Sequence, residues 1–272
     1  MIKFFRHIRQ RMLKENRFSM PAGRLARYFL YAIGEIVLVV IGILIALQIN
    51  MWNEGRKDRV KEQVVLHQLL EEFHANLEQL DAKIQAREVI IRASTQALGY
   101  MDHQEGVRLD SLMAKICPIT ITPTFDPINN DLVSSGNLRL IRNAHLNRLL
   151  TEWPIYVVQL REIEDEYVGN YRDHLMPTLL NIGIGRDVEN ALARDNSNYN
   201  WLLDKNDHAE KPSIGRSLRP VVISEVLNNK ALEGLLANAI QLNHVGNLES
   251  RSLRLRITEI LALLRQETSD QR

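Results

Sequence analysis

The chain has 272 residues, 45% of them hydrophobic and 25% charged, and its formal net charge is +1 at pH 7. These values are ordinary for a globular protein, and the chain is long enough for one sizeable domain beside an anchor. Cys117 is the only cysteine, which excludes a disulfide within the chain and a cysteine-based zinc site in one copy. We expect Cys117, beside Pro118, to be a buried thiol rather than a reactive one.

Basic residues are concentrated in the leader, residues 1–27. Its single acid is Glu15, and its basic residues are Lys3, Arg6, Arg9, Arg11, Lys14, Arg17, Arg24 and Arg27. Nucleic-acid binding is one interpretation of such a cluster, but its position beside an apolar segment favours a membrane surface, so we expect no nucleic-acid partner. Apolar residues recur at helical spacing at Met1, Phe5, Ile8 and Met12. The leader is therefore predicted to form a basic amphipathic helix on the cytoplasmic face of a bilayer.

An apolar segment, YFLYAIGEIVLVVIGILIALQINMW, runs from Tyr28 to Trp52. Between residues 29 and 49 it is interrupted only by Glu35 and Gln48, and it is long enough to cross a bilayer as a helix. Both the leader and the apolar run are too long for a signal peptide, and no small-residue cleavage motif follows. We predict one transmembrane helix at residues 28–53, with the lipid bilayer as its partner.

The basic residues also predict the orientation of this helix. Eight precede it, and four follow it closely: Arg56, Lys57, Arg59 and Lys61. This bias predicts a cytoplasmic amino terminus and a periplasmic carboxy-terminal domain, in a single-pass protein of the cell inner membrane.

Glu35, Gly42 and Ala46 share one face of the predicted transmembrane helix, and Asn53 continues it. Gly42 and Ala46 form a small-x-x-x-small motif, which is typical of close helix packing in membranes. Glu35 has three interpretations: an acid at the interface, a packing contact with another helix, or a proton-coupling group. We favour the interfacial or packing role, and regard Glu35, Gly42 and Ala46 as a possible helix-packing face.

A heptad pattern follows the anchor, in residues 54–100. Its apolar positions are Leu66, Leu70, Phe73, Leu77, Leu80 and Ile84, while Arg87 and Ser94 interrupt its continuation. Because no proline lies between Trp52 and Gly99, the transmembrane helix is predicted to continue directly into this long helix. The seam faces either a second chain, as in a coiled coil, or another helix of the same chain.

The remainder, residues 101–272, reads as further helices joined by loops. Proline and β-branched residues from Cys117 to Pro127 predict an extended surface arm, Ser134–Gly136 a helix end, and 195–212 a polar loop. Asn143 is the expected cap of a helix.

That helix is predicted to be kinked or split by Pro154 and ended by Pro177. A last helical block is predicted at residues 223–266, with a possible break at Gly246. Its apolar residues Leu253, Ile257, Ile260 and Leu264 repeat at heptad-like spacing. Two such faces, one early and one late in the domain, predict that they pair in an all-α helical bundle.

Motifs that carry chemistry are scarce. His67, Glu71 and His74 lie on one helical side as potential metal ligands, but a di-iron bundle needs a second Glu-x-x-His, so we predict no metal site and no cofactor. The acidic run at 162–166 reads as a solvated helix face. Ser134 and Ser135 read as helix-terminal residues, so no catalytic residue is assigned.

Four stretches carry a resemblance: the opening MIKFFRHIRQRMLKENRF, the anchor YAIGEIVLVVIGILIALQINMWNE, the following RKDRVKEQ, and LVSSGNLRLIRNAHLNRLLTEW at residues 132–153. In these the chain resembles an uncharacterised bacterial membrane family, domain of unknown function 6090. Glu35 lies in the family's GEIVLVVIGILIALQIN string, whereas residues 19–24 are an insertion. The resemblance implies an inner-membrane protein and names no substrate or catalytic residue.

Three functions remain open. The first is a non-enzymatic interaction or scaffold protein whose helical domain binds itself or another envelope protein. The second is an extracytoplasmic sensory or signalling module, which would need a partner because residues 1–27 hold no output domain. The third is an enzyme without a recognisable motif.

Overall fold

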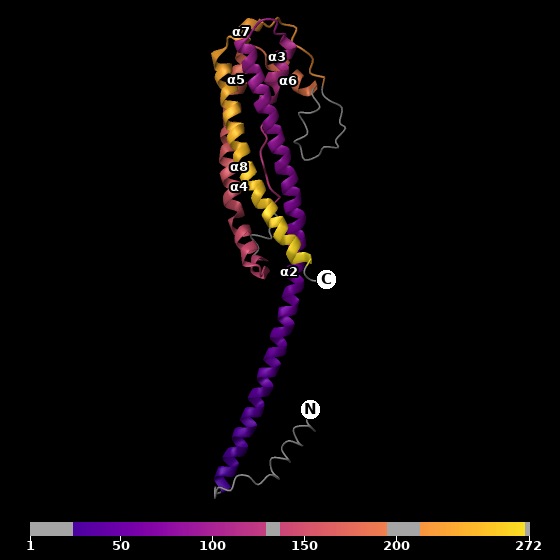
Figure 1. Ribbon diagram of the computed structural model, residues 1–272, viewed down its shortest axis with the longest axis vertical. Coiled ribbons are helices and arrows are strands. Elements are labelled where there is room, and N and C mark those ends of the chain that lie inside the picture. Colours follow the sequence, from indigo (N-terminus) through magenta and orange to yellow (C-terminus); the bar gives the residue numbers. More distant parts are fainter. Residues whose placement is uncertain (1–23, 129–136, 195–212, 270–272) are drawn as a thin grey trace. The chain divides into compact units, whose positions relative to one another are not determined.

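The structure is a computed structural model that describes residues 24–128, 137–194 and 213–269, and the regular structure within them is entirely helical (Figure 1). The helices are α2 (Arg24–Asp102), α3 (Leu109–Ile116), η1 (Cys117–Thr120), η2 (Asn137–Leu140), α4 (Ala144–Asn170), η3 (Tyr171–Leu175), α5 (Met176–Ile182), α6 (Gly185–Arg194), α7 (Ile223–Leu227) and α8 (Lys230–Ser269). The predicted all-α class is confirmed for these residues. The chain divides into two units, Met1–Arg59 and Val60–Arg272.

The first unit contains the amino-terminal part of α2. This helix runs unbroken from Arg24 to Asp102, so the prediction that the apolar helix continues into the heptad helix is confirmed. The predicted amphipathic helix of the leader lies almost wholly in residues 1–23, outside the described residues.

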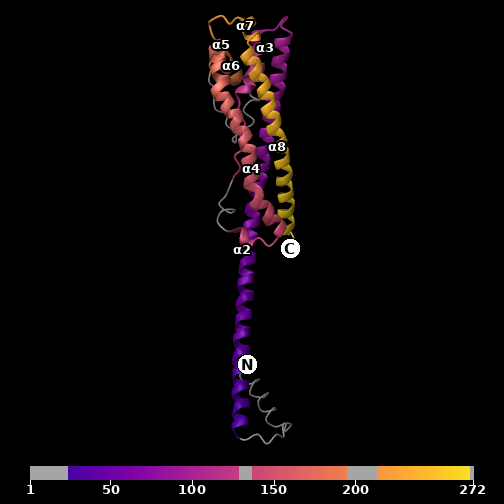
Figure 2. The same cartoon turned by 90° about the vertical axis from the view of Figure 1, so that its left-hand side faces the viewer.

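The second unit is built on three long helices, α2, α4 and α8, which lie side by side in both views (Figures 1 and 2). In the contacts between α2 and α8, residue numbers increase along α2 while the numbers of their partners on α8 decrease. The amide of Gln63 donates to the Glu267 carbonyl, Arg254 donates to Asp81, and Arg251 donates to Glu88. The carboxy-terminal part of α2 and α8 are therefore antiparallel.

The heptad seam of α2 is buried within one chain, as one of the two predicted alternatives. Leu66, Phe73 and Leu80 are fully buried, and Leu70, Leu77 and Ile84 are partly buried against the same cluster. Helix α8 contributes Leu253, Ile257, Ile260 and Leu264 to this cluster, which confirms the predicted pairing of the two segments.

Helix α4 supplies a third side to that cluster. Its buried residues include Leu146, Leu150, Trp153 and Leu160. The Trp153 ring meets Phe73 edge to face, with ring centroids 5.1 Å apart, a favoured aromatic geometry. The seam is thus covered by two helices rather than one.

A second cluster fills the other end of the domain, where α3, α5, α6 and α7 gather (Figure 1). Ile90 of α2 and Leu232 of α8 enter it, together with Leu112, Leu179 and Val188 from the short helices. The short helices thus close the end of the bundle that the three long helices leave open.

The predicted split of the helix at Pro154 and its predicted end at Pro177 are wrong. Helix α4 starts at the Asn143 cap, whose side chain accepts from the backbone N–H groups of His145 and Leu146, as predicted, but it continues through Pro154. Pro177 does not end the helical run. The preceding turn is a π-helix, in which the Met176 N–H bonds to the Tyr171 carbonyl, and the run ends at Gly183, whose φ of 83° suits glycine.

The last block also differs from the prediction. It breaks between α7 and α8, where Asn229 caps α8 by accepting from the Leu232 N–H. Gly246 lies inside α8 without interrupting it. A Cβ added to Gly246 would meet Nε of Arg87 at 3.4 Å, so this glycine makes room for a side chain of α2.

Candidate functional site

The apolar part of α2 is the first candidate site. The helix is long and apolar enough to cross a membrane, and the most apolar stretch of it is wholly unburied within the structure. Glu35, Gly42 and Ala46 are exposed, and a Cβ added to Gly42 would meet no atom within 4 Å. The chain's own described packing therefore does not account for the small residues on this face.

The suggested metal ligands on α2 have other surroundings. His67 is exposed and its Nδ1 lies 2.8 Å from the Gln63 carbonyl, while Nε2 of His74 lies 3.0 Å from Arg265. Within the described residues, no group of three or more His, Cys, Asp or Glu side chains is placed to hold a metal ion. Cys117 is buried, as predicted.

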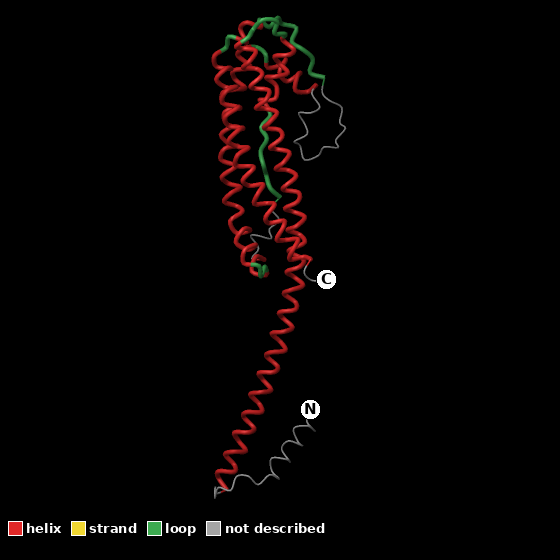
Figure 3. Tube along the Cα trace, viewed as in Figure 1, coloured by secondary structure: helices red, strands yellow, loops and turns green. Residues whose placement is uncertain are grey.

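An extended segment, residues 121–128, runs beside the long helices, and we call it the strap (Figure 3). Ile121, Pro123, Phe125 and Pro127 are buried, whereas the residues between them are more exposed. This alternation is that of an extended chain with one face on a core. The prediction of a surface arm is wrong, because the apolar residues at every second position bury one side of the segment.

Helix side chains bond to the strap's backbone, since a segment with two prolines and, among the described residues, no neighbouring strand lacks backbone partners. Asn76 accepts from the Ile128 N–H at 2.7 Å and donates to the same residue's carbonyl at 3.2 Å. Gln79 accepts from the Asp126 N–H at 3.1 Å. Glu164 accepts from the Phe125 N–H with both oxygens, at 3.1 and 3.0 Å.

Glu164 also forms an ion pair with Arg87, and both side chains are about 3% exposed. Arg87 further donates to the Ser250 hydroxyl at 2.7 Å and to the Pro123 carbonyl at 3.2 Å. This one cluster therefore joins α2, α4, α8 and the strap.

The buried cluster corrects one prediction and explains an interruption of the heptad pattern. The acidic run is not uniformly a solvated face: Glu162, Asp165 and Glu166 are exposed, but Glu164 is buried. Arg87 and Ser94, which interrupt the apolar pattern of α2, are 2% and 0% exposed and lie in the core. The sequence did contain a signal for this ion pair: Arg87 falls at a heptad position of a buried seam, where a charged side chain needs a buried partner of opposite charge.

Burial sets the ionisation of this cluster. It raises the pKa of Glu164 from 4.5 to about 7, against the opposing effects of Arg87, the Phe125 N–H, Lys83 and Arg161. Burial likewise lowers the pKa of Lys83, against the attraction of Glu164. The charges are enclosed by helices and strap, so the cluster is arranged to hold the strap rather than to meet a substrate.

A pH dependence follows from Glu164. Because its pKa is higher in the folded chain than in the unfolded one, the folded state binds the proton more tightly between these two values. The stabilisation is complete below pH 4.5 and is lost as the pH rises through about 7. We expect the free energy of unfolding to fall by about 1–3 kcal/mol from pH 5 to pH 8 through this group. Urea denaturation at both pH values measures it, and Glu164→Gln, which cannot titrate, should lose this difference. An unchanged difference in the variant would contradict the assignment.

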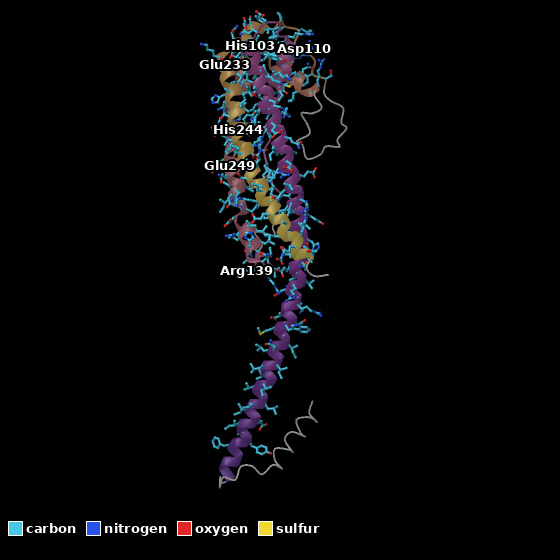
Figure 4. All side chains as sticks on the ribbon, viewed as in Figure 1. His103, Asp110, Arg139, Glu233, His244 and Glu249 are labelled. Atoms are coloured by element: carbon cyan, nitrogen blue, oxygen red, sulfur yellow. The ribbon has the colours of Figure 1, made fainter. Side chains whose placement is uncertain are left out.

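Ionisable side chains that are exposed or half-buried are spread over the domain. In Figure 4, His103 and Asp110 lie near the end that carries α3, whereas Arg139 lies near the opposite end. Glu233, His244 and Glu249 follow one another along α8. These labelled groups come from different elements and do not converge on one catalytic point.

The comparisons with known proteins give a family and no activity. A family model described as a family of unknown function (DUF6090) matches residues 35–152, which include Glu35, Gly42, Ala46 and the heptad seam. No match was found among curated proteins or among solved structures. The resemblance read from the sequence is thereby confirmed: from residue 35 to residue 152 the chain matches the uncharacterised family DUF6090.

Proposed function

We propose that the chain is a single-pass protein of the cell inner membrane whose periplasmic helical domain binds other proteins as a scaffold, without catalysing a reaction. The observation that carries this proposal is the exposed apolar part of α2. Side chains such as Ile36, Leu44 and Ile49 are 60–62% exposed on a helix long enough to cross a bilayer. Exposing so many apolar side chains to water is unfavourable, and the hydrocarbon interior of a bilayer removes them from water.

The domain's polar interior supports a binding role. Arg87 and Glu164 form a buried ion pair, and their other hydrogen bonds are directed to α8 and to the strap. Charges used in this way fix one packing of helices, which suits a rigid interaction module. Binding to a second copy or to another envelope protein remains part of the proposal.

We predict one membrane crossing with the amino terminus in the cytoplasm, because basic residues are more numerous before the apolar segment than after it. Alkaline phosphatase fused after Arg272 should be active, because this enzyme matures only outside the cytoplasm. A green fluorescent protein fused at the same place should be dark, because it fluoresces only in the cytoplasm. Carbonate extraction should leave the chain in the membrane pellet. A fluorescent fusion together with an inactive phosphatase fusion would show that the carboxy terminus lies in the cytoplasm, which would contradict the predicted orientation.

We further predict that the face of Glu35, Gly42 and Ala46 packs against another membrane helix. Small residues let two backbones approach, so Gly42→Ile should weaken self-association about 5- to 30-fold, which corresponds to roughly 1–2 kcal/mol. A bacterial membrane two-hybrid assay measures this, with Ile43→Leu as a neighbouring control of unchanged bulk. Unaltered association of Gly42→Ile at equal expression would show that lipid covers this face.

A second candidate function is sensory. A hollow of about 410 Å³, open to solvent, is lined by Asp173, His174, Pro177, Thr178, Ala231 and Leu235 beside the π-helical turn. A small polar ligand bound there would contact α8, whose other end packs against α2. Protection of His174 from diethyl pyrocarbonate by an extract of periplasmic small molecules would favour this function over a scaffold.

A further inference from the structure

Helix α2 carries an aromatic and basic face directly after its apolar part. Trp52, Arg56 and Arg59 are spaced four and three residues apart, so they share one side of the helix. All three are exposed, Trp52 to 71%. Among the described residues, neither arginine forms an ion pair, and the nearby acid Glu54 accepts from the amide of Asn50 at 3.2 Å, on another side.

Gly55 borders this face, three residues after Trp52 and four before Arg59. Glycine destabilises a helix interior relative to alanine, so its presence in an exposed helix calls for a reason. A Cβ added to Gly55 would meet no atom within 4 Å, so the packing of the described chain does not require a glycine. Because Gly55 has no side chain, the helix surface between Trp52 and Arg59 is left open.

The chemistry of this face matches a phosphate group. Two guanidinium groups donate paired hydrogen bonds to phosphate oxygens, and an indole N–H adds a donor at the edge of the apolar layer. Arg56 and Arg59 follow Trp52 by about 6 and 10 Å along the axis at 1.5 Å per residue. With their long side chains they reach the polar layer outside the hydrocarbon, which is roughly 5–8 Å thick on each side.

We propose that Trp52, Gly55, Arg56 and Arg59 form a binding site for the phosphate of an anionic phospholipid headgroup. The site rests on the membrane-spanning function proposed above. It differs from general attraction to an anionic surface because it requires one helical face and the open surface at Gly55, and not only positive charge.

The test uses the full chain in nanodiscs that contain equal amounts of phosphatidylglycerol and phosphatidylcholine. After extraction in mild detergent, mass spectrometry gives the ratio of the two lipids that remain bound. The wild-type chain should retain phosphatidylglycerol preferentially. Arg56→Gln with Arg59→Gln should lower the preference about ten-fold, the effect of losing a charge-assisted hydrogen bond. Gly55→Leu should lower it with no change of charge.

A matched control, Arg139→Gln with Arg148→Gln, removes two exposed charges from the helical domain and should leave the ratio unchanged. An equal loss in both double variants, or an unaffected Gly55→Leu, would overturn the site. Displacement of the lipid by 10-fold excess inorganic phosphate would also overturn it, in favour of a soluble anion. If carbonate extracts the wild-type chain from membranes, the proposed membrane-spanning function is wrong. If the chain stays in the membrane but shows no lipid preference, only the headgroup site is wrong.

Discussion

Replacing Glu164 by leucine is expected to lower the free energy of unfolding by about 3–5 kcal/mol. Leucine fills a similar volume, so the effect arises from charge and hydrogen bonding rather than from a cavity. Arg87 stays protonated in any folded environment and would be left in the core without its anion. The Phe125 N–H of the strap would lose its acceptor as well.

Chemical denaturation of the full chain in detergent, followed by circular dichroism, measures this change. Glu162→Leu is the matched control, because Glu162 is exposed two residues away on the same helix. The double variant Glu164→Leu with Arg87→Met should recover much of the lost stability, since an apolar pair leaves no unpaired charge. A Glu164→Leu variant as stable as the control would show that the cluster does not hold the fold.

The long helices were predictable because their signals are local. The heptad positions from Leu66 to Ile84 and from Leu253 to Leu264 repeat at the period of a helix, and the absence of proline predicts the continuity of α2. Even so, the sequence left open whether the seam meets a second chain. The contribution of α4 to its burial depends on tertiary packing, which periodicity does not report.

The burial of the strap and the partners of Arg87 were not predictable, because they depend on residues far apart in the sequence. Arg87, Glu164 and Ser250 come from three helices, and the burial of Arg87 can be understood only once its contacts with the other two are known. In sequence, Glu164 is one of several neighbouring acids, and only the register of α4 selects it for burial. The predicted split at Pro154 and the predicted end at Pro177 fail for the same reason, because tertiary packing and a π-helical turn keep the helical run unbroken where local propensity predicts a break.

The largest loss of stability is expected from Phe73→Asp, in the centre of the seam. Phe73 is fully buried and contacts Trp153 edge to face. Truncation of a buried aromatic side chain alone costs about 3–5 kcal/mol, and an unpaired buried carboxylate adds several more. The sum reaches the roughly 5–15 kcal/mol by which whole domains are stable, so the domain should unfold or aggregate.

Gln68→Asp is the control for this variant, since Gln68 is exposed on the same helix one turn and a half earlier and gains the same charge. We expect Gln68→Asp to keep wild-type helicity and melting temperature, and Phe73→Asp to lose its cooperative transition while the helix signal of the membrane segment remains. If Phe73→Asp instead melts like the wild-type chain, its side chain is solvated in solution. The packing of α2 against α4 and α8 would then be wrong, because the seam leaves no room for a charge at that position.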